Sequence, residues 1–239
     1  MDVQKLKQEL LTQKENKLKG NIYHFSQVNF SYNSNRIEGS KLTREETEQI
    51  FNASNLIIDN DDTIETINHF KLFDYILEKL DKPLSINMII KMNVILKQNT
   101  SHSKDPNYNI GGFKINDNII GQIVPTKTSS YKNVEKELNK LLKEYNEIST
   151  PTIEDIIDFH YKFELIHPFS DGNGRVGRII MFKECLKNNI IPFIILNEHK
   201  NFYLRGLKEY SKDKLYLIDT IKTEQDIYQK ICKELFLIN

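Results

Sequence analysis

The sequence predicts an all-α protein with one inserted β-hairpin. Most segments of the chain place apolar residues three and four positions apart, which is the spacing of one helix face. Residues 101–130 break this pattern with five glycines and prolines, which mark turns. No internal repeat or low-complexity linker divides the 239 residues, so we expect a single domain, 1–239.

The N-terminal part is predicted to contribute two helices. Residues 2–18 are polar and amphipathic, and because such a helix is marginal alone it must dock on the rest of the chain. Residues 23–39 carry a partly helical apolar stripe and end at Gly39, a residue suited to the left-handed conformation that terminates a helix. Glu38 would then lie in the last turn, where the helix dipole disfavours a carboxylate.

Three further helices are expected to build the core and carry no chemistry that the sequence reveals. Residues 42–51 include Thr43, which begins a capping-box pattern. Residues 62–80 form a long apolar-striped segment, and Ser85 is the expected N-cap of a helix over residues 86–97.

A β-hairpin is predicted at about residues 111–125. Phe113–Ile115 and Ile119–Val124 would be its strands, and Asn116–Asn118 would be its polar turn. A two-stranded hairpin on a helical protein has open edges, and an open edge can pair with an extended peptide. The hairpin is therefore a candidate docking element for another chain.

The remaining helices follow from the same periodicity. Residues 131–148 and 153–166 are strongly periodic, and a loop separates the second of them from an apolar helix over 173–186. Residues 212–238 are expected to close the fold with one or two more helices.

Residues 167–178, HPFSDGNGRVGR, contain the densest chemistry in the sequence. They form a turn-rich loop followed by a helix N-terminus, whose free amides and dipole favour an anion. Arg175 and Arg178 lie on one face of the first turns, and two guanidiniums at this positive end indicate a polyphosphate ligand. Asp171 offers a hard oxygen ligand for Mg²⁺, and His167 is a candidate general base. Taken singly, each of these residues is more often structural.

Composition excludes several classes of protein. The 33 basic and 33 acidic residues balance, which argues against a general nucleic-acid binder or a binder of anionic membranes. Cys185 and Cys232 are too few for a disulfide scaffold. The longest apolar run, residues 190–196, is far too short to cross a bilayer, and the charged N-terminus has no signal-peptide core. We expect a soluble cytoplasmic protein, and the many Lys, Asn and Ile residues suggest a bacterial source.

The stretch HPFSDGNGRVGR resembles the Fic family signature H-x-F-x-[D/E]-G-N-G-R-x-x-R at every specified position. The resemblance covers roughly residues 34–210 and implies the Fic fold, with a hairpin flap, and an enzyme that transfers AMP from ATP to a hydroxyl side chain of a target protein. It implies these roles: His167 as base, Asp171 as Mg²⁺ ligand, Gly172, Asn173 and Gly174 lining the phosphate site, and Arg175 and Arg178 gripping the outer phosphates. Related phosphate-transferring toxins carry Lys at the position of Gly174, so glycine there favours nucleotidyl transfer.

Two further segments resemble parts of the same family. Ser34, Glu38 and Gly39 fit the inhibitory pattern [S/T]-x-x-x-E-[G/N], which implies that Glu38 pairs with Arg178 and blocks productive ATP binding. The predicted hairpin resembles the flap that docks a target segment, although Lys114 stands where relatives often have Arg. The flap residues are Gly112, Phe113, Lys114 and Ile115, and Tyr203 is the expected contact to the nucleoside.

Several alternatives stay open at this point. Glu38 is also suited to positioning a water that removes AMP from a modified protein, which would reverse the reaction. A non-catalytic, nucleotide-sensing partner in a toxin–antitoxin or regulatory pair is the other alternative. The target with its Tyr, Ser or Thr hydroxyl, modification of the protein itself, and a homodimer are all compatible with the sequence.

Overall fold

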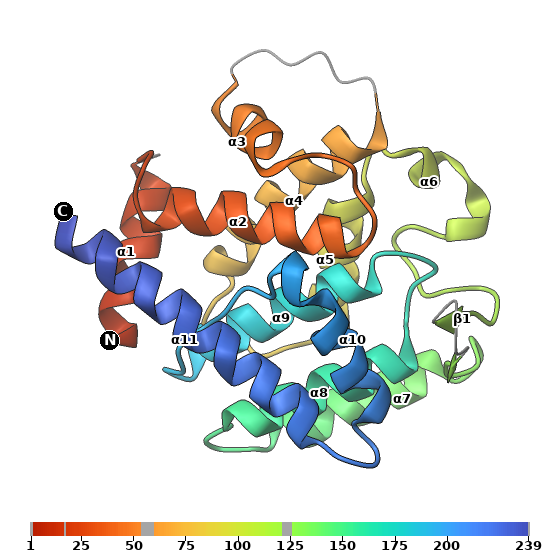
Figure 1. Cartoon of the computed structure of the whole chain (residues 1–239). Helices are drawn as coiled ribbons and strands as arrows, with labels where there is room; N and C mark the ends of the chain where they lie inside the picture. Colours follow the sequence, from red (N-terminus) through yellow and green to blue (C-terminus); the bar gives the residue numbers. More distant parts are fainter. Residues whose placement is uncertain (1, 17, 54–59, 121–125, 239) are drawn as a thin grey trace.

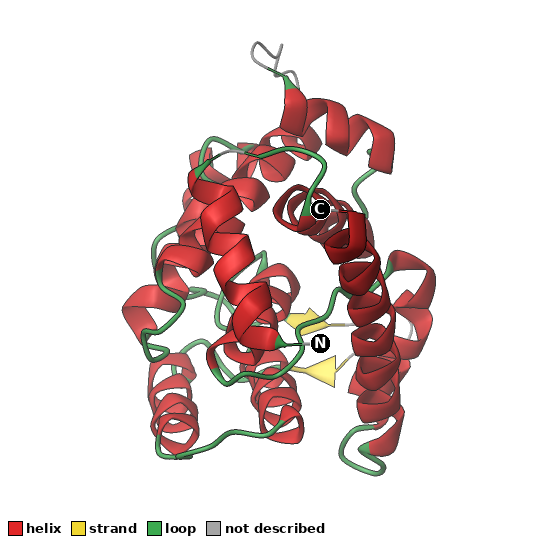
Figure 2. Ribbon diagram, turned by 90° about the vertical axis from the view of Figure 1, so that its left-hand side faces the viewer, coloured by secondary structure: helices red, strands yellow, loops and turns green. Residues whose placement is uncertain are grey.

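The structure is a computed structural model that describes residues 2–16, 18–53, 60–120 and 126–238. The all-α prediction is confirmed, since helices account for nearly all regular structure in the described residues (Figures 1 and 2). The α-helices are α1 (Val3–Glu15), α2 (Ile22–Ile37), α3 (Arg44–Asn52), α4 (Asp61–Glu78), α5 (Ile86–Lys97), α6 (Ser101–Lys104), α7 (Val134–Asn146), α8 (Ile153–Ile166), α9 (Asn173–Lys187), α10 (Lys200–Glu209) and α11 (Leu215–Ile238). Two short 3₁₀ turns, η1 (Pro106–Tyr108) and η2 (Asn197–His199), connect them.

Helix α9 lies at the centre of the fold, where it packs against α1, α2, α4, α5 and α8 (Figure 1). Of its residues, only Gly174 and Lys187 are not buried. A helix that is covered on all sides is mostly apolar, as residues 179–182, Cys185 and Leu186 are, and the charged Lys183 and Glu184 are buried as an ion pair 2.7 Å apart. The arginines of the first two turns are likewise held in the interior of the protein.

The helix starts follow the capping signals of the sequence. Thr43 and Thr152 each form a complete capping box, with Glu46 and Asp155 respectively, and Ser85 accepts a hydrogen bond from the amide at the third position of α5. The same local signals therefore set where α3, α5 and α8 begin.

The N-terminal helix docks as expected, because Leu6 and Leu10 are fully buried. The two ends of the chain also meet, since the ammonium of Lys5 lies over the ring of Phe236. Helices α1 and α11 are thus neighbours at one side of the fold (Figure 1).

The hairpin prediction needs correction. Phe113–Ile115 is not a strand, and the described pairing is a two-residue antiparallel ladder between β1 (Ile119–Ile120) and β2 (Thr126–Lys127). Residues 121–125, the other part of the predicted flap, lie outside the described residues. An inserted β-hairpin over residues 111–125 is thus not supported.

Hydrogen bonds to the loop after α8 explain why Phe113–Ile115 is not a strand. The amide of Lys114 donates to the carbonyl of Pro168, and its ammonium donates to the carbonyl of Ile166 and to the side chains of Asn118 and Thr128. The first of these contacts occupies a backbone amide that a strand ladder would have used, and the buried ammonium holds the side chain in place. The segment is consequently fastened to the HPFSDGNGRVGR loop.

None of the described helices is both long and apolar enough to span a membrane.

Two histidines buried in the interior, His69 and His160, predict a loss of stability in weak acid. Burial lowers the pKa of each to about 3, helped by the guanidiniums of Arg175 and Arg178 at His69 and by that of Arg178 at His160. Because the unfolded chain takes up these protons below about pH 6.5 and the folded protein does not, stability is complete above that pH and falls as pH decreases. His167, whose pKa is lowered to about 4, adds a similar loss, and Glu164, whose pKa is raised to about 8, offsets that loss, so we expect the free energy of unfolding to drop by about 2 kcal/mol between pH 6 and pH 5.

Denaturant titrations at these pH values measure the effect. His69→Asn keeps a polar partner for Ser31 Oγ, which lies 3.0 Å from His69 Nδ1, and removes one titrating group. The slope of stability against pH should fall by about half in this variant. An unchanged slope would show that other groups control acid stability.

Candidate active site

The site begins where α8 ends. His167 is the C-cap of α8 and adopts the left-handed conformation, with φ 50° and ψ 64°, and its amide donates to the carbonyl of Phe163. The imidazole is mostly buried, and burial, together with the ammonium of Lys114, lowers the pKa of His167 to about 4. The side chain is therefore neutral at pH 7, as a general base must be.

The loop that follows is held rigidly by Asn173. Its side-chain oxygen accepts from the amide of Phe169 and its side-chain nitrogen donates to the carbonyl of the same residue. Gly172 has φ 87°, and a Cβ there would lie 3.1 Å from side-chain atoms of Asn93 and Leu96. The Asn173 side chain thus shapes the loop, and the loop backbone remains to line the site.

Asp171 lies at the centre of a charged network. Its carboxylate accepts from the ammonium of Lys97 at 2.5 Å and lies 2.9 Å from His102 Nδ1 and 3.4 Å from Arg175 Nη2. Burial raises its pKa, but the cations of Arg175 and Lys97 outweigh burial and hold the pKa well below the usual range. Asp171 is consequently a permanent anion at the start of α9.

Arg175 closes this network through Glu65 of α4. The carboxylate of Glu65 binds both the guanidinium of Arg175 and the ammonium of Lys97. Arg175 is 3 % exposed, and its Nε is a buried donor without a hydrogen-bond partner among the described residues. A buried, unpartnered N–H is uncommon in proteins and indicates a site for an acceptor.

Arg178 is bound by both residues of the predicted inhibitory pattern. Its Nη2 donates to the carboxylate of Glu38 at 2.7 Å and to the carbonyl of Ser34 at 3.0 Å, and its Nε donates to Ser34 Oγ at 3.0 Å. Burial raises the pKa of Glu38, but Arg178 and Arg175 lower it more strongly, so the carboxylate is charged. The Glu38–Arg178 pairing that the sequence predicted is present.

The carboxylate of Glu38 also covers the start of α9. A Cβ added to Gly174 would collide with Glu38 Oε1, so the carboxylate lies directly against the first turn of that helix. Glu38 is the C-cap of α2 and Gly39, with φ 107°, turns the chain away. The side chain of Glu38 is 37 % exposed, so it closes the site at its outer side.

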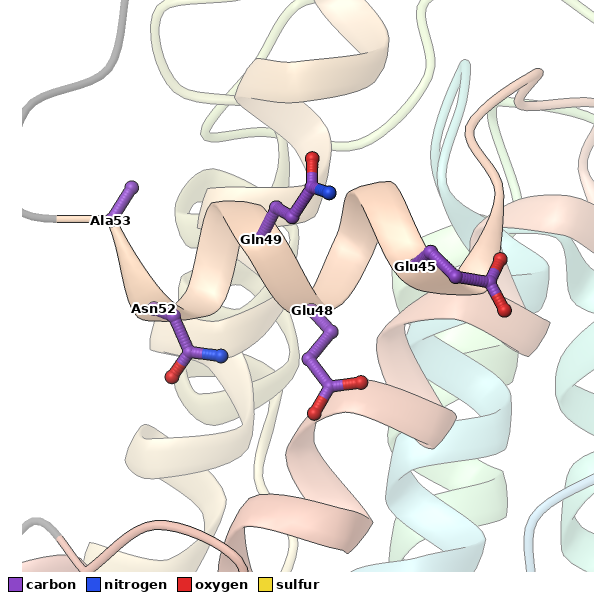
Figure 3. A pocket seen from close by; sticks show the side chains of 5 residues that line it. All are labelled: Glu45, Glu48, Gln49, Asn52 and Ala53. Atoms are coloured by element: carbon purple, nitrogen blue, oxygen red, sulfur yellow. The ribbon is translucent and has the colours of Figure 1, made fainter.

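A cavity of about 450 Å³ opens beside these residues. Its lining includes Glu38, Asp171 and Arg175 together with Glu65 and His102. A second hollow lies on α3 and is lined by Glu45, Glu48, Gln49, Asn52 and Ala53 (Figure 3). It contains none of the predicted site residues.

Tyr203 lies in the deep wall of the site. It is 1 % exposed, its hydroxyl is 2.7 Å from His160 Nε2, and the guanidinium carbon of Arg178 lies 5.9 Å from its ring centre. The hydroxyl already has a partner, so any contact of Tyr203 to a nucleoside would use the ring.

The predicted flap residues lie near His167 but differ in how deeply they are buried. Lys114 is buried, Phe113 lies beside Phe169 with ring centres 6.4 Å apart, and Ile115 is 43 % exposed. Gly112 approaches Asn109 so closely that a Cβ would lie 2.6 Å from Asn109 Nδ2. Ile115 is thus the apolar side chain that this segment presents to the outside.

Five polar side chains of the site were missed from the sequence: Glu65, Lys97, His102, His160 and Glu164. Glu65, Lys97 and His102 come from α4, α5 and α6, far from the HPFSDGNGRVGR segment in the sequence. The other two had a signal, since His160 and Glu164 interrupt an otherwise apolar face of α8 at a spacing of four. A polar pair on a core-facing stripe is a candidate for function.

The geometry defines a class of protein: an all-helical domain with an anion site at a buried helix N-terminus and a neutral histidine beside it. The sequence model of the Fic/DOC family matches residues 83–185. A solved Fic domain containing signaling protein from Bacteroides thetaiotaomicron VPI-5482 has the same fold, with a TM-score of 0.78 and 21 % identity over 96 % of this chain and 97 % of that one. Fic-1 from C. elegans has a TM-score of 0.72 and 22 % identity, covering 99 % of this chain and 72 % of that one.

Curated relatives agree with this match. The protein adenylyltransferase Fic of Drosophila yakuba is 26 % identical over 179 residues, which cover 74 % of this chain and 36 % of that protein. A probable protein adenylyltransferase of Aquifex aeolicus (strain VF5) is 33 % identical over 82 residues, 34 % of this chain and 25 % of that one. Residues 83–185 therefore belong to the Fic/DOC family, and the chain spans about a quarter to a third of the length of these two relatives.

Proposed function

We propose that this protein is a protein adenylyltransferase that transfers AMP from ATP to a hydroxyl side chain of a target protein. The observation that carries the proposal is the convergence of His167, Asp171, Arg175 and Arg178 at the N-terminus of α9. The names of the curated relatives support the same activity.

The start of α9 is suited to the phosphates of ATP. The amides of Gly172 to Gly174 lie at the positive end of a helix, which favours phosphate oxygens. Arg175 and Arg178 add two guanidiniums that are fixed by burial before any ligand arrives. Arg175 Nε is available as a donor without breaking a bond. Such pre-arranged donors stabilise charge at little cost of reorganisation.

His167 would act on the target hydroxyl. Its pKa of about 4 leaves the imidazole unprotonated at neutral pH, and Nδ1 is buried, so Nε2 is the nitrogen that can meet a substrate. In the reaction, the target oxygen forms a bond to the α-phosphorus and the bond to pyrophosphate breaks. The hydroxyl proton passes to Nε2 of His167.

Asp171 would hold Mg²⁺ together with the phosphates of ATP. Mg²⁺ sites in nucleotide enzymes commonly use one or two carboxylates and leave the remaining positions to phosphate and water, and Asp171 is a permanently charged carboxylate beside the anion site. No group of three metal-binding side chains is found in the described parts of the chain. When bound, the ion would neutralise charge on the phosphates.

Glu38 would restrain the enzyme. Its carboxylate holds Arg178 and covers Gly174, and these are the groups that the outer phosphate of ATP would contact. ATP bound beside Glu38 would therefore lack one guanidinium and face a fixed negative charge. We accordingly propose that Glu38 and Ser34 keep the protein in a low-activity state.

The target would dock beside His167 along residues 112–115 and the β1–β2 ladder. Exposed Ile115 offers an apolar contact, and the open edge of a short strand can pair with an extended segment. A Tyr, Ser or Thr of another protein, or of this chain itself, would present the hydroxyl, and a homodimer is compatible with this arrangement. We propose that the reaction takes place in the cytoplasm of a bacterium, where ATP and Mg²⁺ are supplied.

A second candidate is the removal of AMP from a modified protein. The observation that favours it is the charged, partly exposed carboxylate of Glu38 at the phosphate site, which is suited to activating water. Water would attack the phosphorus and give a proton to Glu38, the bond between phosphorus and the target oxygen would break, and that oxygen would take up a proton, which releases AMP and restores the target hydroxyl. Release of AMP from a pre-modified target, lost in Glu38→Gln, would support this reaction.

Two labelled forms of ATP test the main proposal. The Glu38→Gly protein is incubated with Mg²⁺, bacterial lysate and ATP labelled at either the α- or the γ-phosphate. Label should enter protein from α-labelled ATP alone, and mass spectrometry should find AMP on a Tyr, Ser or Thr side chain. Label from the γ-position would instead indicate phosphate transfer, and ATP-dependent thermal stabilisation with no label on any protein would indicate a nucleotide sensor.

Replacing Asp171 with asparagine should remove the dependence of ATP binding on Mg²⁺. Loss of the one carboxylate that faces both the metal and the phosphates should weaken binding of ATP with Mg²⁺ by at least about tenfold, or ~1.4 kcal/mol. Calorimetric titration with and without Mg²⁺ measures the difference. Asp62→Asn is the matched control, because Asp62 lines the same cavity and accepts from the amide of Lys41. Equal effects of the two substitutions would contradict the assignment of Asp171.

A further inference from the structure

Helix α8 carries a polar stripe on the face that meets α9. His160, Glu164 and His167 follow one another at spacings of four and three, so they share one face of the helix. They face Gly177, where a Cβ would lie 2.7 Å from His160 Nδ1 and 2.8 Å from Glu164 Oε1. The absence of a side chain at Gly177 is what allows this stripe to pack against α9.

Each residue of this stripe has one buried polar atom without a hydrogen-bond partner among the described residues. Glu164 Oε1 and His167 Nδ1 have no hydrogen-bond partner there, and Glu164 Oε2 lies 3.8 Å from His167 Nδ1. Glu164 is only 8 % exposed. A buried carboxyl without a partner costs stability, and such groups in native proteins usually have a role.

The groups around Glu164 come from four directions. They are His160 and His167 of α8, Arg178 of α9, Glu38 of α2 and Tyr203 of α10, with Lys114 beside His167. Burial raises the pKa of Glu164 to about 8, Arg178 opposes this rise and Glu38 adds to it. The carboxyl is therefore uncharged at pH 7 and still has an oxygen that can accept a hydrogen bond.

We propose that Glu164 is the positioning residue for His167: its carboxyl accepts a hydrogen bond from Nδ1–H and so fixes the tautomer in which Nε2 is free to take the proton of the target hydroxyl. This proposal rests on the proposed function for its effect on rate. The separation of 3.8 Å is longer than a hydrogen bond. Catalytic hydrogen bonds of unliganded enzymes are often long and shorten when substrate binds, and a small rotation of either side chain would close the gap.

The geometry explains why a carboxyl is needed at this depth. In the left-handed conformation of His167 the ring lies back against α8, so Nδ1 has no access to water. With no acceptor at Nδ1, the proton would reside on Nε2 and the imidazole would be unable to act as a base. When His167 gains the proton of the substrate, the same carboxyl stabilises the imidazolium.

Two substitutions at Glu164 test the proposal in the Glu38→Gly protein. Glu164→Gln keeps an acceptor oxygen and should retain transfer within about threefold, whereas Glu164→Leu removes the acceptor and should lower kcat by about 10- to 100-fold. The KM for ATP should stay the same, because neither variant alters the anion site. The same substitutions at Glu154, an exposed carboxylate in the first turn of α8, are the matched control and should leave kcat unchanged.

The pH profile separates positioning from a merely structural role. With Glu164 present, the rate should change in a step near pH 8 as the carboxyl ionises beside His167, and Glu164→Gln should lack this step. Equal losses of kcat in Glu164→Gln and Glu164→Leu, or full activity of Glu164→Leu, would overturn the proposal.

Nitrogen-15 NMR of the His167 ring gives a readout that needs no transfer activity. The ring should be protonated at Nδ1 both when Glu164 is intact and in Glu164→Gln, and it should shift toward the Nε2-protonated form in Glu164→Leu. If no protein is ever labelled but this shift occurs, the proposed function fails while the contact stands. If transfer occurs and the tautomer is the same in all variants, Glu164 has no positioning role.

Discussion

We expect substitution of His167 with alanine in the Glu38→Gly protein to lower AMP transfer by about 10²–10⁴-fold, the contribution of a positioned general base. Binding of ATP should remain within about twofold of the parent protein, because His167 supplies none of the phosphate contacts. The measurement is the initial rate of label transfer from α-labelled ATP, with binding followed by calorimetry. An alanine variant that labels targets at the parent rate would exclude His167 as the base.

A second variant is needed because the backbone of His167 is in the left-handed conformation. The residue has φ 50°, and alanine in that conformation costs about 1–2 kcal/mol. Asparagine tolerates the left-handed region and has no basic nitrogen, so His167→Asn separates loss of the base from local strain. Both variants should lose transfer to the same degree, while thermal unfolding should show the larger destabilisation for alanine.

We expect replacement of Glu38 with glycine to raise AMP transfer by about 10- to 100-fold, in the range of typical coupling free energies of about 1–3 kcal/mol. The substitution frees the guanidinium of Arg178 and removes the negative charge that lies against Gly174. The affinity for ATP with Mg²⁺ should rise as well, because a carboxylate no longer competes with the outer phosphate. Rates of self-modification and of target labelling measure the change.

Graded substitutions show whether charge or bulk is responsible. Glu38→Gln keeps the size of the side chain and removes its charge, so it should give an intermediate rate. Ser34→Ala removes the hydrogen bond from Arg178 Nε and leaves the ion pair with Glu38, so its effect should be smaller than that of glycine. If the Glu38→Gly protein is no more active than the parent protein, Glu38 does not restrain the enzyme.

The helices of this protein could be predicted from its sequence because their signals are local. Capping residues such as Thr152 and Ser85 bind amides within the same turn, so the sequence alone identifies where α8 and α5 begin. The prediction of a strand at Phe113–Ile115 was wrong for the opposite reason. Its apolar alternation was compatible with a hairpin, but hydrogen bonds from Lys114 to Ile166 and Pro168, which lie far along the chain, determine its conformation.

The candidate site likewise has one part that the sequence predicts and one part that only the folded structure brings together. His167, Asp171, Arg175 and Arg178 fall within one short segment, where their spacing alone indicated an anion site. The charged residues that bind these side chains, in contrast, are spread along the sequence. Glu65 binds both Arg175 and Lys97, and these three residues come from α4, α9 and α5, so only the packing of the helices brings them together.

The burial of α9 has a consequence for how this protein can diverge. Because that helix is enclosed along most of its length, an exchange within it disturbs folding and chemistry at once, and few exchanges are tolerated. Helix α2 reaches the guanidinium of Arg178 through Ser34 and through Glu38 at its C-terminal end, and Glu38 is partly open to solvent. If Glu38 restrains the enzyme as proposed, natural variants can change the level of activity through this one exposed carboxylate while the reacting groups stay as they are.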